Sequence, residues 1–569
     1  MCQTQLEAVA RHIREVFEEE GKAEVRKPWL PPLGRMLLSP VVSKPVSIKE
    51  SEGVDKRSAS LSVTVGKADI PGMQEQRELL HHFERDGNLL FAASAGFGKT
   101  VFLTTVLISL ALTYDADDVN FYILDFGNHG CMPMKELLHT AEYISADDDE
   151  RYRKFKKLIM EELGARKRLF AEYAAPSPSA YQELSGKSLK TVVVAVDQFD
   201  VVKEMGIEEE EFFTKLTRDG VGLGIYTVAA ATRVNSIRQA TLNNFKNKIA
   251  GYQFDENETF LIVGRIPFRQ PEIKGRVMAG GEDVHEAQIY TMASCEDKAK
   301  YSKDIKALIQ ESRRRFPGKE APHIPVLPQE FRSAMLKEYP CDGKDYIVGL
   351  DIEEVTGKGF DKSAGVFAVI GNTGSGKTNI LRVLADQAAA KGRTCIFDSR
   401  DMELYRYRHI PNVLYVEGSR EKEIFLKEME EEVERRRRFL KKRLGEDKNL
   451  SPRKLADEMP FYTIFIDDPD EFTEFMKEDL DRAANIMKEG LALGIVCIIS
   501  IHAANPRGIS VIDRMVKQAA NGLVLSSQGV MPVFPVSSTR ELPKFGDGLL
   551  FRNGIYQRVR LPRHEGAEL

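Results

Sequence analysis

The fold of this chain is decided by the stretch Gly371-Asn372-Thr373-Gly374-Ser375-Gly376-Lys377-Thr378, here called the second loop. It matches the pattern G-x-x-x-x-G-K-[ST], whose glycines let backbone N–H groups approach phosphate oxygens. The lysine of this pattern reaches the β- and γ-phosphates, and the hydroxyl after it holds Mg²⁺. An apolar run at 366–370 predicts a strand before the loop, and the pattern of 379–390 predicts a helix after it. We therefore predict that all eight residues bind a nucleotide, with Thr378 also a metal ligand.

An altered copy of this pattern, here called the first loop, reads Ala93-Ser94-Ala95-Gly96-Phe97-Gly98-Lys99-Thr100. We predict that these residues also contact nucleotide and that Thr100 is a metal ligand. Alanine replaces the first glycine, and a left-handed backbone at that turn would cost alanine about 1 kcal/mol or more. Nucleotide binding without efficient hydrolysis is the preferred interpretation, while no binding and competent hydrolysis remain open.

Each loop is followed by an apolar strand that ends in an acid, Asp197 in the first case and Asp467 in the second. P-loop ATPases use such an acid to hold Mg²⁺ and a neighbouring acid to activate the attacking water. Asp197 and Asp467 are therefore predicted metal ligands, and Asp468 is the predicted catalytic base. Asp468 is one methylene shorter than the usual Glu, so slow turnover is expected. The first copy has Gln198 at this place, which cannot take a proton at neutral pH.

The order of elements is duplicated, because strands, loops and charged helices follow one another twice at a spacing of 270 to 278 residues. Strands that read as continuous apolar runs between helices indicate a mostly parallel sheet covered on both faces. The predicted fold class is α/β, with two tandem P-loop domains. The first domain is predicted at 58–316 and the second at 346–569. Residues 1–57 are predicted to hold the end of a preceding unit and a proline-rich linker, and 317–345 a second linker.

Composition excludes several classes of protein. The 569 residues carry a formal charge of −5, which argues against a protein that tracks duplex DNA, so no nucleic-acid partner is expected. Six cysteines without a C-x-x-C pair argue against a disulfide framework or a zinc site. The longest apolar run, 101–113, is too short for a membrane span. An amphipathic helix predicted at 6–20 suggests the end of a preceding domain, so any membrane anchor would lie upstream.

Several charged residues have open roles. The arginine-rich helix predicted at 430–443 could bind nucleic acid, but we prefer a solvent-exposed helix face, because glutamates precede its basic residues at helical spacing. His502 follows the last apolar strand, where either a γ-phosphate sensor or a structural histidine would fit. The candidates for an arginine that reaches into a neighbouring subunit's site are Arg233, Arg238, Arg507 and Arg514.

The repeated pattern resembles the FtsK/SpoIIIE-type ATPases. The strand end 121–127 resembles the family's "LDF-G" segment, and 275–288 resembles its late "GRG…EFQ" segment. The tandem order and the proline-rich linker at 27–33 are similar to the C-terminal ATPase domains of the EssC/EccC group of type VII secretion ATPases.

This resemblance implies RecA-like domains that bind ATP and Mg²⁺ and form a ring, possibly a hexamer, with other copies. It implies small helical-hairpin substrates of the WXG class, and upstream ATPase and membrane domains in a full-length protein at the cytoplasmic face of the bacterial cell membrane. The fragment itself is expected to be soluble. The leading prediction is an ATP-binding motor segment of a protein-export machine. A largely non-hydrolysing substrate-docking module and a DNA translocase of the FtsK type are the alternatives.

Overall fold

The computed structural model describes residues 4–19, 30–43, 61–266, 269–279, 284–318, 320–341, 343–446, 458–502, 511–519, 521–525, 544–552 and 554–565. Arg507 lies outside these residues, as do parts of both proline-rich linkers. The chain divides into unit 1, Met1–Ile324, and unit 2, Pro325–Leu569. This boundary falls inside the stretch 317–345 that the sequence predicts to be a linker.

Unit 1 is built on one sheet, in which the strand of the first loop lies near the middle. The strand order is β3 (Glu75–His82), β2 (Ser62–Ile70), β11 (His285–Thr291), β10 (Arg276–Ala279), β9 (Asn247–Gly251), β4 (Leu89–Ala92), β8 (Ile225–Ala231), β7 (Thr191–Asp197), β5 (Val119–Asp125) and β6 (Thr140–Ser145). Strands β9 to β6 run parallel to one another, and β10, β11, β2 and β3 extend the sheet antiparallel. A short β1 (Leu37–Leu38) pairs with β11.

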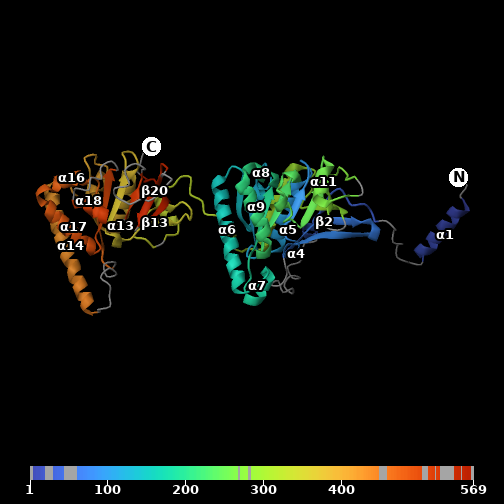
Figure 1. The fold of residues 1–569 in the computed structure, drawn as a ribbon, viewed down its shortest axis with the longest axis horizontal. Coiled ribbons are helices and arrows are strands. Elements are labelled where there is room, and N and C mark those ends of the chain that lie inside the picture. The colour runs from blue at the N-terminus through green and yellow to red at the C-terminus, as the bar shows by residue number, and fades with distance from the viewer. Residues whose placement is uncertain are drawn as a thin grey trace. The chain divides into compact units, whose positions relative to one another are not determined.

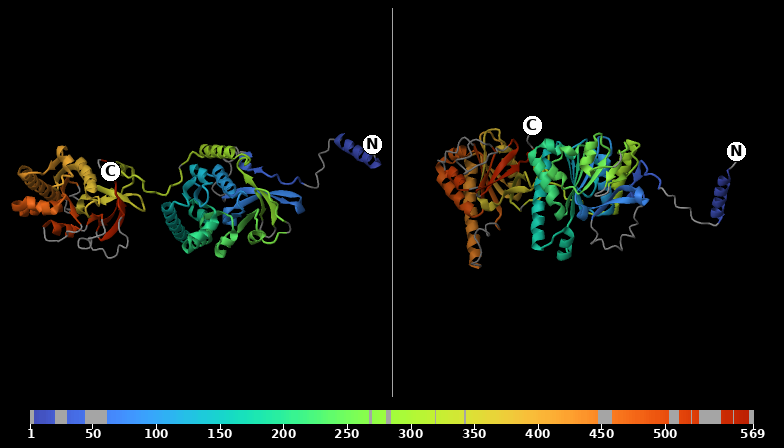
Figure 2. Two further views of the ribbon diagram at one scale, coloured as in Figure 1. Left: turned by 90° about the horizontal axis from the view of Figure 1, so that it is seen from above. Right: turned by 45° about the vertical axis from the view of Figure 1, so that its right-hand side comes forward.

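Helices cover both faces of this sheet, as the apolar strands require. One core packs α5 (Lys99–Thr113) and α12 (Lys298–Arg315) against the sheet, and the other packs α6 (Asp149–Glu172) and α9 (Ile207–Asp219). The view from above in Figure 2 shows α12, in yellow-green, and α6, in cyan, on opposite sides of the strands, and Figure 1 labels α5, α6 and α9. The remaining helices are α1 (Gln5–Glu19), α2 (Pro40–Ser43), α4 (Phe83–Asp86), α7 (Pro178–Ser185), α8 (Val202–Met205), α10 (Gln239–Leu242) and α11 (Glu256–Val263).

Unit 2 repeats this plan. Its strand order is β13 (Gly357–Phe360), β12 (Tyr346–Asp351), β21 (Ile555–Arg560), β20 (Asp547–Arg552), β19 (Asn521–Val524), β14 (Val366–Gly371), β18 (Val496–His502), β17 (Phe461–Ile466), β15 (Gly392–Phe397) and β16 (Val413–Tyr415). Helix α13 (Lys377–Lys391) covers one face. The other face carries α14 (Ser419–Glu446), α16 (Pro469–Met476), α17 (Leu480–Ala492) and α18 (Val511–Ala519), and α14 extends beyond the strands (Figure 1). Both units therefore have the predicted RecA-like α/β architecture.

A buried arginine marks the duplication and corrects one prediction. Arg436 on α14 is fully buried and donates to the carbonyl of Leu493 at 2.9 Å and to the carbonyl of Pro460. Its Nε donates to Glu432 at 2.6 Å. The arginine-rich helix is thus not a wholly solvated face, because one of its arginines ties the helix to two loops of the core.

The same arrangement exists in unit 1. Arg166 on α6 is buried and donates to the carbonyls of Leu223 at 2.8 Å and Lys190 at 2.9 Å. Its Nε donates to Glu162 at 2.7 Å. Every partner lies 270 residues before its counterpart in unit 2. A guanidinium offers several donors in a fixed plane, so it satisfies carbonyls that would otherwise be buried without partners.

Candidate functional site

The second loop joins β14 to α13 in the manner that its glycines allow. Gly374 and Gly376 have φ values of +75° and +97°, which a side chain would strain. Lys377 begins α13, and its Nζ donates to the carbonyls of Gly371 at 2.9 Å and Asn372 at 3.0 Å. The ammonium group thus lies over the loop, where phosphates of a nucleotide would be held. Burial lowers the pKa of Lys377.

The first glycine of the loop is required for space rather than for backbone conformation. A Cβ at Gly371 would lie 2.2 Å from Ser375 Oγ and 3.1 Å from Leu525 Cβ. Gly371 is not among the residues with positive φ, and neither is Ala93 of the first loop. The prediction that Ala93 strains the backbone is therefore wrong. Alanine fits there because its methyl group is buried in the core of unit 1.

The acid predicted to hold Mg²⁺ in unit 2 lies at the carboxyl end of β17. Asp467 Oδ2 accepts a hydrogen bond of 2.7 Å from the Ser399 hydroxyl. Burial raises the pKa of Asp467, while the bonds from Ser399 and Ser500 and the charge of Lys377 oppose that shift. A carboxylate, a loop hydroxyl and a lysine on one edge of the sheet are the groups that Mg²⁺ and a triphosphate need. The residues of unit 2 therefore fit Mg·ATP.

The structure gives Asp468 a second use that the sequence did not predict. Its side chain caps the N-terminus of α16 and accepts hydrogen bonds from the backbone N–H of Asp470 at 2.9 Å and of Glu471 at 3.0 Å. Its charge acts on Lys377, together with that of Asp467, and opposes the lowering of the lysine's pKa. One oxygen of the carboxylate that would face water is therefore already bonded to two backbone donors. Its role as catalytic base remains a prediction.

The site of unit 1 has the same frame but different bonds. Lys99 Nζ donates to the carbonyl of Ala93 at 2.9 Å, as its counterpart does in unit 2. The Thr100 hydroxyl donates to Asp197 Oδ2 at 2.9 Å, so the two predicted metal ligands contact each other. Burial raises the pKa of Asp197, and the bond from Thr100 opposes that shift. Gln198 has a left-handed backbone with φ +56°, unlike the extended backbone of Asp468.

Two acid–tyrosine pairs near the phosphate sites were not predicted. Asp398 is the residue after β15, and its Oδ2 accepts a hydrogen bond of 2.7 Å from the Tyr415 hydroxyl. Burial raises the pKa of Asp398, while the bond from Tyr415 opposes the shift. Asp125 Oδ2 accepts from Tyr143 at 3.1 Å in the same place of unit 1. The sequence does show an acid at the corresponding strand end of both copies, Asp125 and Asp398. It could not show that each acid is bonded to a tyrosine, because the tyrosines lie on another strand.

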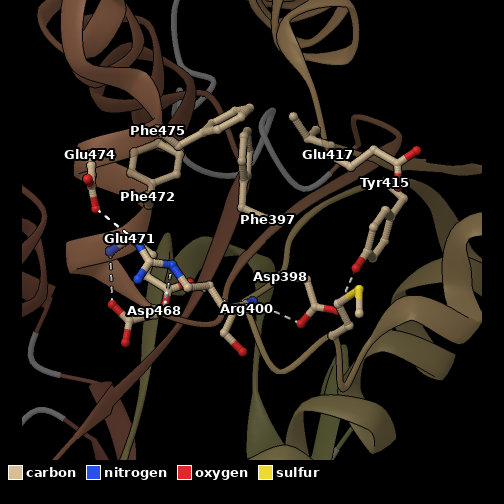
Figure 3. A pocket seen from close by; sticks show the side chains of 13 residues that line it. Phe397, Asp398, Arg400, Tyr415, Glu417, Asp468, Glu471, Phe472, Glu474 and Phe475 are labelled. Atoms are coloured by element: carbon tan, nitrogen blue, oxygen red, sulfur yellow. Dashed lines mark hydrogen bonds and ion pairs between the residues drawn. The ribbon is translucent and has the colours of Figure 1, made fainter.

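A cavity of about 400 Å³ opens at the same edge of unit 2, beside Asp468 (Figure 3). Its apolar wall holds Phe397 with Phe472 and Phe475, whose rings lie 4.8 and 6.4 Å from that of Phe397. Its polar wall holds Arg400, which donates to Glu474 at 3.2 Å. The remaining lining residues are Asp398, Ser399, Met402, Tyr415, Val416, Glu417 and Glu471.

The candidate γ-phosphate sensor and the candidate arginines for a neighbouring subunit's site lie on different elements. His502 ends β18 and its Nε2 lies 3.3 Å from the Thr373 hydroxyl of the second loop, so the structure brings these two together. Arg233 and Arg238 flank the short turn after β8, and Arg514 lies on α18. Within the described residues no helix is long and apolar enough to cross a membrane.

Comparison with known proteins identifies the family. A family model described as the FtsK/SpoIIIE family matches residues 46–279. The ESX secretion system protein YukB of Bacillus subtilis (strain 168) is 31% identical over 98% of this chain, which spans 37% of that protein. A solved structure of EssC (ATPases 2 and 3) from Geobacillus thermodenitrificans is 26% identical, with a TM-score of 0.81 over 94% of this chain and all of that one.

A further solved structure is Thermomonospora curvata EccC (ATPases 2 and 3) in complex with a signal sequence peptide. It is 20% identical, with a TM-score of 0.51 over 90% of this chain and 95% of that one, and supports the fold. Residues 46–279 thus match the FtsK/SpoIIIE family, and over both units the chain is similar to the tandem ATPase domains of type VII secretion proteins.

Proposed function

We propose that this chain is the ATP-binding motor and coupling segment of a type VII protein secretion ATPase, which recognises and helps to export small helical-hairpin proteins of the WXG class. Copies of the chain would form a ring, with upstream ATPase and membrane domains placing it at the cytoplasmic face of the bacterial membrane. The observation that carries the proposal is the second loop, whose Lys377 and neighbouring acids have the arrangement of a P-loop site.

The second loop is the principal nucleotide site in this proposal. Bound Mg·ATP supplies a phosphoanhydride bond and a divalent charge. Lys377 would exchange its bonds to the loop carbonyls for the phosphates, and Thr378 and Asp467 would hold the metal. Asp468 would orient or deprotonate water, in competition with its bonds to the N-terminus of α16. These competing bonds favour slow turnover.

A segment of the chain itself suggests how unit 2 would recognise a substrate. The connector that leaves α12 lies along the edge strand β6 of unit 1. The Ala321 N–H donates to the Leu138 carbonyl at 2.8 Å, and His323 Nδ1 lies 2.8 Å from the Ala141 carbonyl. Ala321 and Ile324 are buried in the core. An extended chain is thus held by backbone bonds and by apolar side chains, as in β-strand addition.

The corresponding edge strand of unit 2 is β16, and it leads into the cavity of Figure 3. In the described part of unit 2, β16 pairs with β15 alone. Tyr415 at its end lines the cavity with Phe472 and Phe475. We propose that an extended segment of the exported protein adds to β16 and places an apolar side chain against these rings.

Two measurements test this function. The first titrates a fluorescent peptide from the C-terminal end of a WXG-class protein into the wild type, Phe475→Ala and Phe545→Ala. Phe545 is 92% exposed on unit 2 and lies outside the cavity, so its variant is the matched control. We expect weaker binding in Phe475→Ala alone, and equal binding in all three proteins would exclude this cavity.

The second measurement separates three functions by their turnover. Steady ATP hydrolysis that is lost in Lys377→Ala supports the motor. Tight ATP retention without phosphate release supports the alternative of a non-hydrolysing docking module. Salt-sensitive duplex binding with DNA-stimulated hydrolysis would instead support a DNA translocase.

A further inference from the structure

Each unit carries a turn that is held by one acid at the edge of the sheet where its phosphate loop lies. In unit 2 this is the stretch 398–404, here called the second turn, which follows β15. Asp398 accepts hydrogen bonds from the backbone N–H of Ser399 at 3.0 Å and of Leu404 at 2.8 Å. The Tyr415 hydroxyl donates to the same carboxylate at 2.7 Å. One acid therefore closes the turn and fixes it to the neighbouring strand.

Unit 1 has the same turn at 125–131, here called the first turn. Asp125 accepts from the backbone N–H of Gly127 at 3.1 Å and of Cys131 at 2.9 Å. The Tyr143 hydroxyl donates to it at 3.1 Å. The two turns have equal length and the same anchor, so they differ only in the side chains that they present to the phosphate site.

The second turn presents a hydroxyl to the acid predicted to hold Mg²⁺. Ser399 Oγ donates to Asp467 Oδ2 at 2.7 Å. Ser500, which is buried on β18, donates a second hydrogen bond to this carboxylate. The next residue of the turn, Arg400, donates its backbone N–H to Glu471 of α16 at 2.9 Å, so the turn is fixed on this side too. The carboxylate is thus held by two serines on well-supported backbone.

Unit 1 has neither of these hydroxyls. The pairing of the strands in the two sheets equates Ser399 with Phe126 and Ser500 with Ala230. Both residues of unit 1 are apolar and buried, so neither can donate a side-chain hydrogen bond.

The hydroxyl of the first loop takes their place. Thr100 Oγ1 donates to Asp197 Oδ2 at 2.9 Å. A Cβ at Gly130 of the first turn would lie 2.6 Å from Thr100 Cγ2, so this turn lies directly against the threonine. Buried carboxylate oxygens are nearly always bonded, and Thr100 supplies a donor where unit 1 has no serine.

We propose that Ser399 is a positioning residue for the metal site of unit 2, whose hydroxyl occupies the carboxylate of Asp467 and so leaves the Thr378 hydroxyl for Mg²⁺. The inference rests on the proposed binding of Mg·ATP by the second loop and adds a residue that makes this loop ready for the metal. Among the described residues no hydrogen bond joins Thr378 to Asp467. Carboxylates that bind metals are commonly held by such outer hydrogen bonds, and their loss weakens metal binding.

The test uses the whole chain with Lys99→Ala, so that the second loop alone reports. ATP is titrated calorimetrically in Mg²⁺ and in EDTA into this parent and into the added variants Ser399→Ala and Ser399→Thr. Ser363→Ala is the matched control, because Ser363 precedes β14 and lies at the opposite end of that strand from the second loop. We expect Ser399→Ala to weaken binding about tenfold in Mg²⁺ and to leave it unchanged in EDTA. Ser399→Thr, which keeps the hydroxyl, and Ser363→Ala should bind like the parent.

A double-mutant cycle distinguishes positioning from a general loss of structure. In a Thr378→Ala background, Ser399→Ala should add little, because the hydroxyl that Ser399 keeps available is already gone. Tyr415→Phe keeps the ring and removes the bond to Asp398, so it should weaken binding in Mg²⁺ alone. This variant carries the test if Ser399→Ala does not fold, and unchanged affinity in it would then overturn the inference.

The other outcomes are distinguishable. Equal affinity of the parent and Ser399→Ala in Mg²⁺ would overturn the inference and leave the proposed function standing. Equal losses in Mg²⁺ and EDTA would assign Ser399 to the folding of the site and would also overturn it. Fully additive losses with Thr378→Ala would show that Ser399 does not act through that hydroxyl. No ATP binding to the parent or to the wild type would refute the proposed function itself.

Discussion

The Thr100 hydroxyl donates a 2.9 Å hydrogen bond to Asp197, and this pair distinguishes the two phosphate sites. In unit 2 the equivalent acid, Asp467, accepts from Ser399, and no hydrogen bond joins it to Thr378 among the described residues. The hydroxyl of the second loop is therefore available to a metal, whereas that of the first loop must first leave its acid. The two sites therefore share a backbone arrangement, but only the second has a loop hydroxyl that is not bonded to the acid predicted to hold Mg²⁺.

The first prediction concerns metal dependence. Thr378→Ala should weaken Mg-dependent ATP binding about tenfold, because it removes a hydroxyl predicted to hold the metal. Thr100→Ala should have a smaller effect, since that hydroxyl is already bonded to Asp197. Calorimetric titration with ATP in Mg²⁺ and in EDTA measures both effects. Equal losses in the two variants would contradict the difference drawn between the sites.

The second prediction concerns pH and stability. Burial raises the pKa of Asp197, so the fold favours its protonated form and loses stability as pH rises through that pKa. Asp197→Asn mimics the neutral form and should raise the unfolding temperature of the nucleotide-free protein by a few degrees at pH 8. This gain should shrink as the pH is lowered through the raised pKa of Asp197 towards the ordinary aspartate value of 3.8. Thermal unfolding of the wild type and Asp197→Asn over this pH series tests the prediction. A gain in unfolding temperature that grows at low pH would contradict it.

The third prediction concerns the buried arginine of α14. Arg436→Ala should destabilise unit 2 by about 3–5 kcal/mol, because two core carbonyls lose this donor and Glu432 keeps only Arg435 as a partner. Arg438 is 73% exposed and its Nε lies 3.8 Å from Glu434, so Arg438→Ala should change stability by about 0.5 kcal/mol or less. Urea unfolding compares the two variants. Similar losses would mean that Arg436 is as solvated as the rest of the helix.

The fourth prediction separates space from backbone strain at the first glycine. Gly371→Ala should weaken ATP binding, because the new Cβ would lie 2.2 Å from Ser375 Oγ. Adding Ser375→Ala removes that clash and should recover part of the affinity. Ala93→Gly should not create hydrolysis in unit 1, since the alanine backbone is not left-handed. Phosphate release from Ala93→Gly on a Lys377→Ala background would refute this interpretation.

Much of the fold could be predicted because local patterns and the duplication agree. The strands before both loops, the helices after them and the strands ending in Asp197 and Asp467 lie where continuous apolar runs and helical spacing placed them. The antiparallel extension of each sheet was not predicted, because pairing between distant strands leaves no periodic trace in a single sequence.

The sequence predicted which residues lie at the candidate site, but it did not predict the hydrogen bonds that they make. The sequence places Lys377 and Asp467 at the edge of one sheet, since parallel strands end together. It could not show that Asp468 caps α16, that Ser399 holds Asp467, or that Arg436 is buried, because each depends on side-chain direction in three dimensions. The roles of the individual site residues remain predictions.

The central claim is that this chain binds Mg·ATP through the second loop. The most direct measurement is calorimetric titration of ATP into the wild type, Lys377→Ala and Lys99→Ala in the presence of Mg²⁺. We predict that Lys377→Ala abolishes the tighter binding event, and that Lys99→Ala retains it and loses at most a weaker one. Unchanged tight binding in Lys377→Ala, or loss of tight binding in Lys99→Ala alone, would contradict the claim.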